Sequence, residues 1–204
     1  MRRLRSSRHV LGALVLALAV AGCGDGEREV SQEGKGGYPW VATDEICNDM
    51  PYGKLADPLG ARQEVADRSG RSGGGAPGFK CVQELVETGP ATWGNVKVEL
   101  DFAFTESVAF AKDIHAKDRE NTGKDIADSG LVPVEKVGKE AFRFGYHKPA
   151  ELRQVRELHV RDSNLLFDVT VTAEAHTPPT PESLKALDAA VDGFAEACLK
   201  ELRK

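Results

Sequence analysis

The sequence lacks closely spaced cysteines, an excess of basic residues and, beyond its first 22 residues, any long hydrophobic run. Its 27 basic residues are outnumbered by 32 acidic ones, which gives a formal net charge of −5. Because an acidic chain is repelled by phosphate backbones, we expect no binding to nucleic acid. Without a close cysteine pair we expect neither a zinc site nor a thioredoxin-like redox centre, and we predict no bound metal.

Signatures of catalysis or cofactor binding are also scarce. The sequence contains no H-E-x-x-H or S-x-x-K motif. Residues 73–78 match G-x-G-x-x-G in letters, but serine and glycine precede them where a dinucleotide loop needs a strand. We interpret this stretch as a flexible loop and expect no cofactor and no enzymatic activity.

Scattered titratable residues are the remaining candidates for chemistry. Glu99 and Asp101 would point the same way from a strand, as a glycosidase or metal pair might, although a solvated strand face explains them more simply. The histidines of the mature chain fall on separate predicted elements, so we expect them to face solvent or lie in turns, while folding could still bring them together. They are His115, His147, His159 and His176.

The N-terminus has the features of an export signal. Four arginines precede an apolar stretch at residues 10–22, which is shorter than the roughly 20 residues of a permanent membrane span. The stretch ends in the tetrapeptide VAGC, which resembles the lipobox of bacterial lipoproteins. We therefore expect residues 1–22 to be removed and Cys23 to carry a diacylglyceryl group. The alternatives are an ordinary secretory signal with Cys23 in a disulfide and, for the export route, either Sec or twin-arginine transport.

Composition divides the mature chain into two parts. Residues 23–37 are polar and glycine-rich, so we interpret them as a flexible tether, and residues 38–204 have the length of one ordinary domain. Removing the first 22 residues, which carry four arginines and no carboxylate, changes the net charge from −5 to −9. We expect the protein to lie on the extracytoplasmic face of the cell membrane, held there by its lipid.

Three cysteines remain for the folded domain. In an oxidising compartment they would form one bridge and leave one thiol. Cys198 falls on the apolar stripe of a predicted helix, where a lone cysteine is usually a small buried hydrophobe. We therefore favour a disulfide between Cys47 and Cys81.

Periodicity predicts an α+β fold. Alternating apolar residues indicate strands at 95–104 and 165–173, with further strands at 79–86, 142–146 and 155–161. A turn at 162–164 should join the strands at 155–161 and 165–173 in an antiparallel hairpin. Two helices are expected, one capped by Thr105 and running to about Arg119, the other capped by Thr180. Mainly one-sided strands with helices suggest an antiparallel sheet flanked by helices.

With these elements in place, the mature chain resembles a family of uncharacterised cell-envelope lipoproteins from high-G+C Gram-positive bacteria. The resemblance rests on the lipobox at Cys23, the segment CNDMPYGKLADPLG that begins at Cys47, the second cysteine at Cys81, the segment VGKEAF and the hairpin LHVRDSNLLFDVTV. It implies a sensor-like or assembly-factor-like α/β domain without an assigned activity. The long glycine loop and the extra Cys198 depart from the family pattern.

These observations favour a non-enzymatic binding or interaction module of the cell envelope. The expected partners are the membrane, through the N-terminal lipid, and either an envelope protein or a small ligand. An envelope hydrolase acting on cell-wall material and a purely structural envelope protein are the alternatives. A cleft containing a converging acid, base or nucleophile would distinguish the hydrolase from the binding module.

Overall fold

The computed structural model describes residues 38, 46–64, 70–71, 78–89, 91–126, 130–148 and 152–204. The expected signal peptide, lipid-bearing Cys23 and tether all lie outside the described residues, as does most of the glycine-rich loop. None of the helices in the described ranges has both the length and the apolar character needed to cross a membrane.

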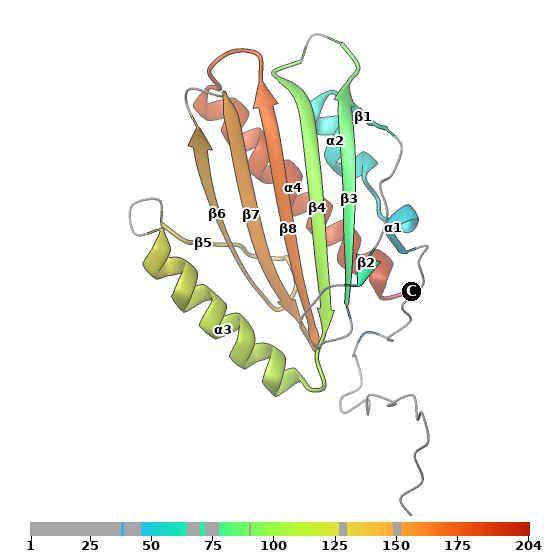
Figure 1. Ribbon diagram of the computed structural model, residues 1–204, viewed down its shortest axis with the longest axis vertical. Coiled ribbons are helices and arrows are strands. Elements are labelled where there is room, and N and C mark those ends of the chain that lie inside the picture. The colour runs from blue at the N-terminus through green and yellow to red at the C-terminus, as the bar shows by residue number, and fades with distance from the viewer. Residues whose placement is uncertain are drawn as a thin grey trace, which may run out of the picture.

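An antiparallel sheet forms the centre of the fold (Figure 1). Its strands lie in the order β1-β3-β4-β8-β7-β6-β5, and β2 pairs with β3 beside this path. The α+β architecture predicted from periodicity is confirmed. The strands are β1 (Ala61–Gln63), β2 (Gly70–Arg71), β3 (Gly78–Glu87), β4 (Trp93–Phe104), β5 (Val132–Pro133), β6 (Glu140–Lys148), β7 (Arg153–Asp162) and β8 (Leu165–Ala175).

The expected hairpin joins β7 to β8. Asp162 pairs with Leu165, so Ser163 and Asn164 form a two-residue turn. Ser163 has φ 57°, in the left-handed region that such turns require. The prediction of turn chemistry at this position is confirmed.

The long C-terminal helix α4 (Pro181–Leu202) covers one face of the sheet, here called the inner face. Thr180 caps it as predicted, since its side chain accepts a 3.2 Å hydrogen bond from the Ser183 amide. Alternate strand residues meet the buried stripe of α4 and close an apolar core. The buried residues of α4 are Leu187, Ala190, Val191, Phe194, Ala195, Cys198 and Leu199.

Two short helices, α1 (Ile46–Asp49) and α2 (Gly53–Leu59), complete the inner layer. Gly60 ends α2 with φ 67°, a conformation that favours glycine. A disulfide joins Cys47 of α1 to Cys81 of β3, the pairing favoured from the sequence, and Cys198 is a buried free thiol. Closing a loop of 34 residues stabilises a domain by about 4 kcal/mol in the chain-entropy model.

Helix α3 (Val108–Asp125) lies on the opposite face of the sheet, here called the outer face. Its cap was predicted wrongly. Ser107 caps α3 by accepting a 3.1 Å hydrogen bond from the Phe110 amide, whereas the Thr105 hydroxyl shares its single proton between the Ser107 and Asn164 carbonyls. Thr105 is buried at the end of β4, so its hydroxyl is already used by the strand-to-helix connection.

Candidate functional site

The outer face carries the chemically interesting side chains. Helix α3 packs on β7 and β8 and so covers part of this face, whereas no described helix covers the β3–β4 part (Figure 1). Under α3 lies a histidine cluster, defined by His115, Asp118, Phe142, His159 and Asp168. On the uncovered part lies a shallow groove.

His159 on β7 is the centre of the histidine cluster. Its Nδ1 atom lies 2.8 Å from Oδ2 of Asp118 on α3 and 3.0 Å from Oδ1 of Asp168 on β8. Its Nε2 atom lies 3.8 Å from Oε2 of Glu157. Because the side chain of His159 is only 14% exposed, these carboxylates rather than water surround the ring.

Aromatic rings complete the surroundings of His159. The Phe142 ring stacks on the imidazole with centroids 4.9 Å apart, and the Phe144 ring does so at 5.6 Å. Phe142 stands directly opposite His159 in the β6–β7 register. The face of a phenyl ring attracts a cation, so this arrangement favours a protonated imidazole.

The electrostatics of the cluster favour the same protonation state. Burial by itself would lower the pKa of His159, but the nearby carboxylates of Asp118, Asp168 and Glu157 outweigh it and raise this pKa to about 11. The pairing with His159 lowers the pKa of Asp118 in turn. At neutral pH His159 is therefore a cation that is already paired, and it cannot accept a proton as a general base.

The second histidine of the cluster behaves differently. His115 on α3 is 6% exposed, and burial lowers its pKa. Its Nε2 atom lies 3.4 Å from the His159 carbonyl oxygen, and its ring is tilted against Phe142 at 5.2 Å. A neutral, enclosed imidazole of this kind packs α3 onto β7.

One group of side chains in the described part of the chain has the geometry to hold a metal ion. Asp118, His159 and Asp168 each offer one ligand atom, and these atoms lie within 4.8 Å of one another. A nitrogen with two carboxylates suits several divalent transition metals. The same three side chains also form ion pairs with one another, in which the imidazole supplies the positive charge.

The open groove has a volume of about 310 Å³ and lies across the ends of β3, β4, β8 and β7. It is mainly polar, with charged side chains from strands that are distant in sequence. Its wall also includes the aliphatic Val86. The groove is lined by Glu64, Glu84, Leu85, Val86, Asn95, Val96, Lys97, Arg153, Thr172 and Glu174.

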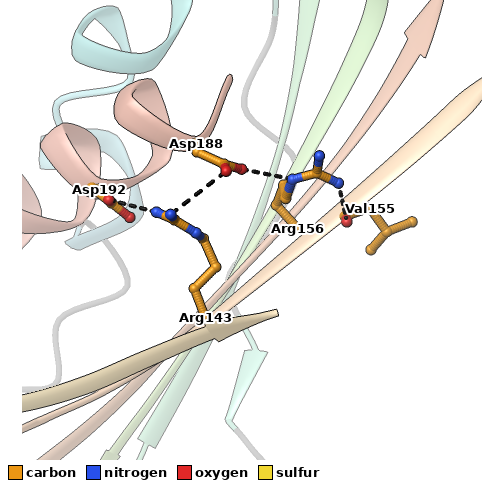
Figure 2. Close-up of polar contacts among 5 residues, drawn as sticks. All are labelled: Arg143, Val155, Arg156, Asp188 and Asp192. Atoms are coloured by element: carbon orange, nitrogen blue, oxygen red, sulfur yellow. Dashed lines mark hydrogen bonds and ion pairs between the residues drawn. The ribbon is translucent and has the colours of Figure 1, made fainter. Parts of the chain in front are cut away.

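A separate polar cluster links the inner face to α4 (Figure 2). Arg143 of β6 lies 2.5 Å from Asp192 and 3.5 Å from Asp188, and Arg156 of β7 lies 2.7 Å from Asp188. A Cβ on Gly145 would come within 2.7 Å of the Arg156 guanidinium, so glycine leaves room for that side chain. These pairs hold the β6–β7 edge against α4.

Two of the four histidines contradict the expectation that they face solvent. His115 and His159 are enclosed between α3 and the sheet. Strand alternation places Glu157 and His159 on one face of the sheet, but it does not show that a helix lies above that face. His176 meets the expectation, since it is 56% exposed and pairs with Glu87 at 2.6 Å. The side chain of His147 lies outside the description.

Glu99 and Asp101 do point the same way from β4, but they have different neighbours. Glu99 forms ion pairs with Lys80 at 2.6 Å and Lys97 at 2.8 Å, which lower its pKa. Burial is the larger cause that raises the pKa of Asp101, and the charge of Asp168 raises it further. The pair is therefore part of a charged strand face, as the simpler interpretation expects.

The glycine-rich loop is followed by a strand and not by a helix. β3 begins at Gly78, the last residue of the G-x-G-x-x-G match, which is the wrong context for a dinucleotide loop. Residues 70–74 also match G-x-S-x-G in letters. A nucleophile elbow needs a helix after its serine, and β3 is the first described element after this loop.

Sequence reasoning missed a clamp at the start of the domain. The Tyr38 hydroxyl donates to Asp162, and Arg203 bonds both Asp162 and, at 3.0 Å, the Tyr38 oxygen. Tyr38 is 4% exposed. No local pattern could reveal this contact, since Asp162 is 124 positions from Tyr38 and 41 positions from Arg203. The clamp places the beginning of the domain beside the β7–β8 turn.

Comparison with known proteins adds little to this geometry. No protein-family model and no curated protein matches the sequence. The extracellular domain of PknH from Mycobacterium tuberculosis is 10% identical, with a TM-score of 0.41 over 78% of this chain and 98% of that one. TTHA0849 from Thermus thermophilus is 13% identical, with a TM-score of 0.27 over 78% and 86%. Likeness at this level carries no functional argument, and membership of a lipoprotein family stays a prediction.

Proposed function

We propose that this protein is an extracytoplasmic binding module, anchored to the membrane through a lipid on Cys23, that holds its partner on the open part of the outer face. The observation that carries the proposal is the groove of about 310 Å³ across four strands. Ligand sites are concave and carry a few polar groups that set orientation, and this groove has both properties. The Cys47–Cys81 disulfide suits an oxidising compartment outside the cytoplasm.

The histidine cluster supports a binding role over a hydrolytic one. A hydrolase needs a base within reach of a nucleophile or an activated water. His159 is paired with carboxylates and protonated at neutral pH, and His115 is buried against Phe142. The cluster therefore fits a role in fastening α3 to the sheet, and the open groove is the better candidate for contact with a partner.

The Tyr38 clamp gives the module an orientation. The tether would join the domain beside Asp162, at one end of β7, whereas Arg153 in the groove stands at the other end. The length of β7 separates these ends by about 30 Å. A domain tethered at Tyr38 would present its groove away from the membrane, toward other envelope components.

Site-specific photo-crosslinking in intact cells tests this function. A photoreactive side chain at Asn95, in the groove, should give a discrete adduct in the membrane fraction. The same group at Lys117, exposed on α3, is the matched control and should give none. Equal adducts from both positions, or none from Asn95, would contradict the proposal.

The anchor has a test of its own. Mass spectrometry of the N-terminal peptide should show a diacylglyceryl adduct on Cys23, and Cys23→Ala should release the protein from the membrane. An unmodified Cys23 would contradict the lipid anchor but would leave the proposed binding function unaffected.

A further inference from the structure

We infer that Asp118, His159 and Asp168 form a binding site for one divalent transition-metal ion, which would join α3 to the β7–β8 hairpin. The inference goes beyond the proposed binding function, because this site shares no residue with the open groove. The expectation of no bound metal rests on cysteine spacing, which says nothing of donors that only folding brings together. The site follows from the spacing of its donor atoms, the surroundings of the ring nitrogen, and its charge and accessibility.

The three donor atoms are spaced as the ligands of one ion. Around a six-coordinate ion with metal–ligand distances of about 2.1 Å, neighbouring ligand atoms lie about 3.0 Å apart. The Nδ1 atom of His159 lies 2.8 Å from Oδ2 of Asp118 and 3.0 Å from Oδ1 of Asp168. All three donor atoms lie within 4.8 Å of one another. The two oxygens therefore have the separation from the nitrogen that neighbouring ligands of a single ion require.

The ring nitrogen of His159 approaches both carboxylates without forming a hydrogen bond. Within the part of the chain that the structure describes, Nδ1 is buried and has no hydrogen-bond partner, although both carboxylate oxygens lie within 3.0 Å. Both oxygens therefore lie well away from the N–H direction. An oxygen next to a nitrogen ligand in an octahedral site lies about 45° from the nitrogen–metal direction, which is too far for a good hydrogen bond. This arrangement is poor for a hydrogen-bonded proton and suits a metal ion on Nδ1.

The charges of the site match a divalent ion. Asp118 and Asp168 carry two negative charges against one on the protonated imidazole of His159, and Glu157 adds a carboxylate 3.8 Å from its Nε2 atom. When a metal ion binds Nδ1, the proton on that nitrogen leaves to solvent. The two positive charges of the ion then balance the two ligand carboxylates.

A neighbouring carboxylate adds to the negative charge of the site. Asp101 stands opposite Asp168 in the β4–β8 register, on the same face of the sheet. Lys80 partly offsets the charge of Asp101, but Lys80 is also paired with Glu99 at 2.6 Å. A divalent ion on Asp168 would reduce the repulsion between the two aspartates.

Solvent can reach the site from one side. The side chains of Asp118 and Asp168 are 42% and 49% exposed, whereas His159 lies beneath them. An ion can therefore enter past the two carboxylates and keep water molecules in its remaining coordination positions. Because the three ligands come from α3, β7 and β8, a bound ion would fasten the helix to the sheet.

Titration calorimetry with Ni²⁺ tests the inference on the purified, untagged full chain after treatment with a chelator. Ni²⁺ is a suitable probe because it binds imidazole and oxygen ligands. The wild type should bind one ion per chain. Asp118→Asn and Asp168→Asn should each lower the affinity at least about tenfold, because each removes a charged ligand. Asp113→Asn on the exposed side of α3 and His176→Gln are the matched controls, and each should change the affinity less than about twofold.

Proton release distinguishes this site from ion binding by surface carboxylates. Titrations of the wild type in two buffers with different enthalpies of ionisation should show about one proton released per bound ion, because His159 gives up its Nδ1 proton. This measurement needs no variant, so it holds even where a substitution prevents folding. No binding, binding without proton release, or unchanged affinity in both folded aspartate variants would overturn the inference. None of these results bears on the groove, which the adduct at Asn95 tests separately.

Discussion

The two long helices, α4 and α3, pack on opposite faces of the same sheet by different means. α4 buries seven residues against the inner face, all apolar or cysteine. α3 buries two, Ala111 and His115, and contacts the outer face through the ion pairs of Asp118. One helix is held by area removed from water, and the other by charge and ring contacts.

This difference determines how the packing of each helix should respond to a change in pH. Hydrophobic burial changes little with pH, whereas an ion-paired imidazole loses its contribution when it loses its proton. Elements with few buried apolar contacts also open at lower free energy than the rest of a domain. We therefore expect α3 to depend on the protonation of His159 and α4 to depend on packing.

The largest effect is expected from truncating the core under α4. Phe194→Ala removes a fully buried ring that contacts the Tyr52 ring at 5.6 Å, and should lower the free energy of unfolding by about 4 kcal/mol. Phe110→Ala on α3, where the ring is 47% exposed, should cost less than about 0.5 kcal/mol. Urea unfolding of both variants measures the contrast, and similar losses would show that α3 is also held by apolar packing.

The next effect concerns the centre of the histidine cluster. His159→Gln leaves Asp118, Asp168 and Glu157 close together without their cation, and should lower the free energy of unfolding by about 3 kcal/mol. His176→Gln removes an exposed histidine and should change stability by less than about 0.5 kcal/mol. A His159→Gln protein as stable as the wild type would refute the role given to the ion pairs.

The pH dependence of stability should show the same cluster. The folded pKa of His159 is about 11 and its ordinary value is 6.5, so its contribution is complete below pH 6.5 and is lost as the pH rises toward 11. Between pH 7 and pH 9 the free energy of unfolding should fall by about 2 kcal/mol. His115, whose pKa burial lowers, is neutral in the folded state throughout this range and adds only a small slope of opposite sign near pH 7.

Urea unfolding at both pH values, with His159→Gln as the control, measures this slope. The variant should show much less pH dependence than the wild type, because the histidine that binds an extra proton in the folded state has been removed. Equal slopes would place the pH dependence elsewhere in the molecule.

The smallest effect concerns the ion pairs between α4 and the β6–β7 edge of the sheet. Gly145→Ala places a methyl group within 2.7 Å of the Arg156 guanidinium and should displace it from Asp188 (Figure 2). Since these pairs are partly exposed, we expect a loss of about 1 kcal/mol. In an Arg156→Ala background the same substitution should cost less, because neither the guanidinium of Arg156 nor its Cδ atom, 2.8 Å from the added methyl group, remains to be displaced. An undiminished cost would mean that the alanine strains β6 itself.

Much of the fold could be predicted because its signals are local. The apolar spacing of α4, its Thr180 cap, the alternation in β4 and β8 and the turn at Ser163 each appear within a few consecutive residues. Each such pattern constrains the backbone directly, so the strands and helices were placed close to their observed positions. The cap of α3 was misplaced because Thr105 and Ser107 are both good cap residues two positions apart.

The candidate site could not be predicted in the same way. His159 stands opposite Asp168 in the register of the β7–β8 hairpin, but it meets Asp118 only because α3 crosses that hairpin, and the groove unites residues from β3, β4, β7 and β8. Strand alternation states which residues share a face, but it does not state which part of that face a helix will cover. Burial of an imidazole, and hence its pKa, depends on that cover.

The sequence by itself therefore determined the type and span of the main elements, together with the apolar face of α4, because propensity and periodicity act within each segment. The tertiary structure alone decided that His159 is a buried cation, that Tyr38 is clamped by Asp162 and Arg203, and that Glu84 and Glu174 border one groove. These features depend on contacts between segments distant in the chain, and only the packed arrangement of the sheet and α3 sets the local solvent exposure and charge.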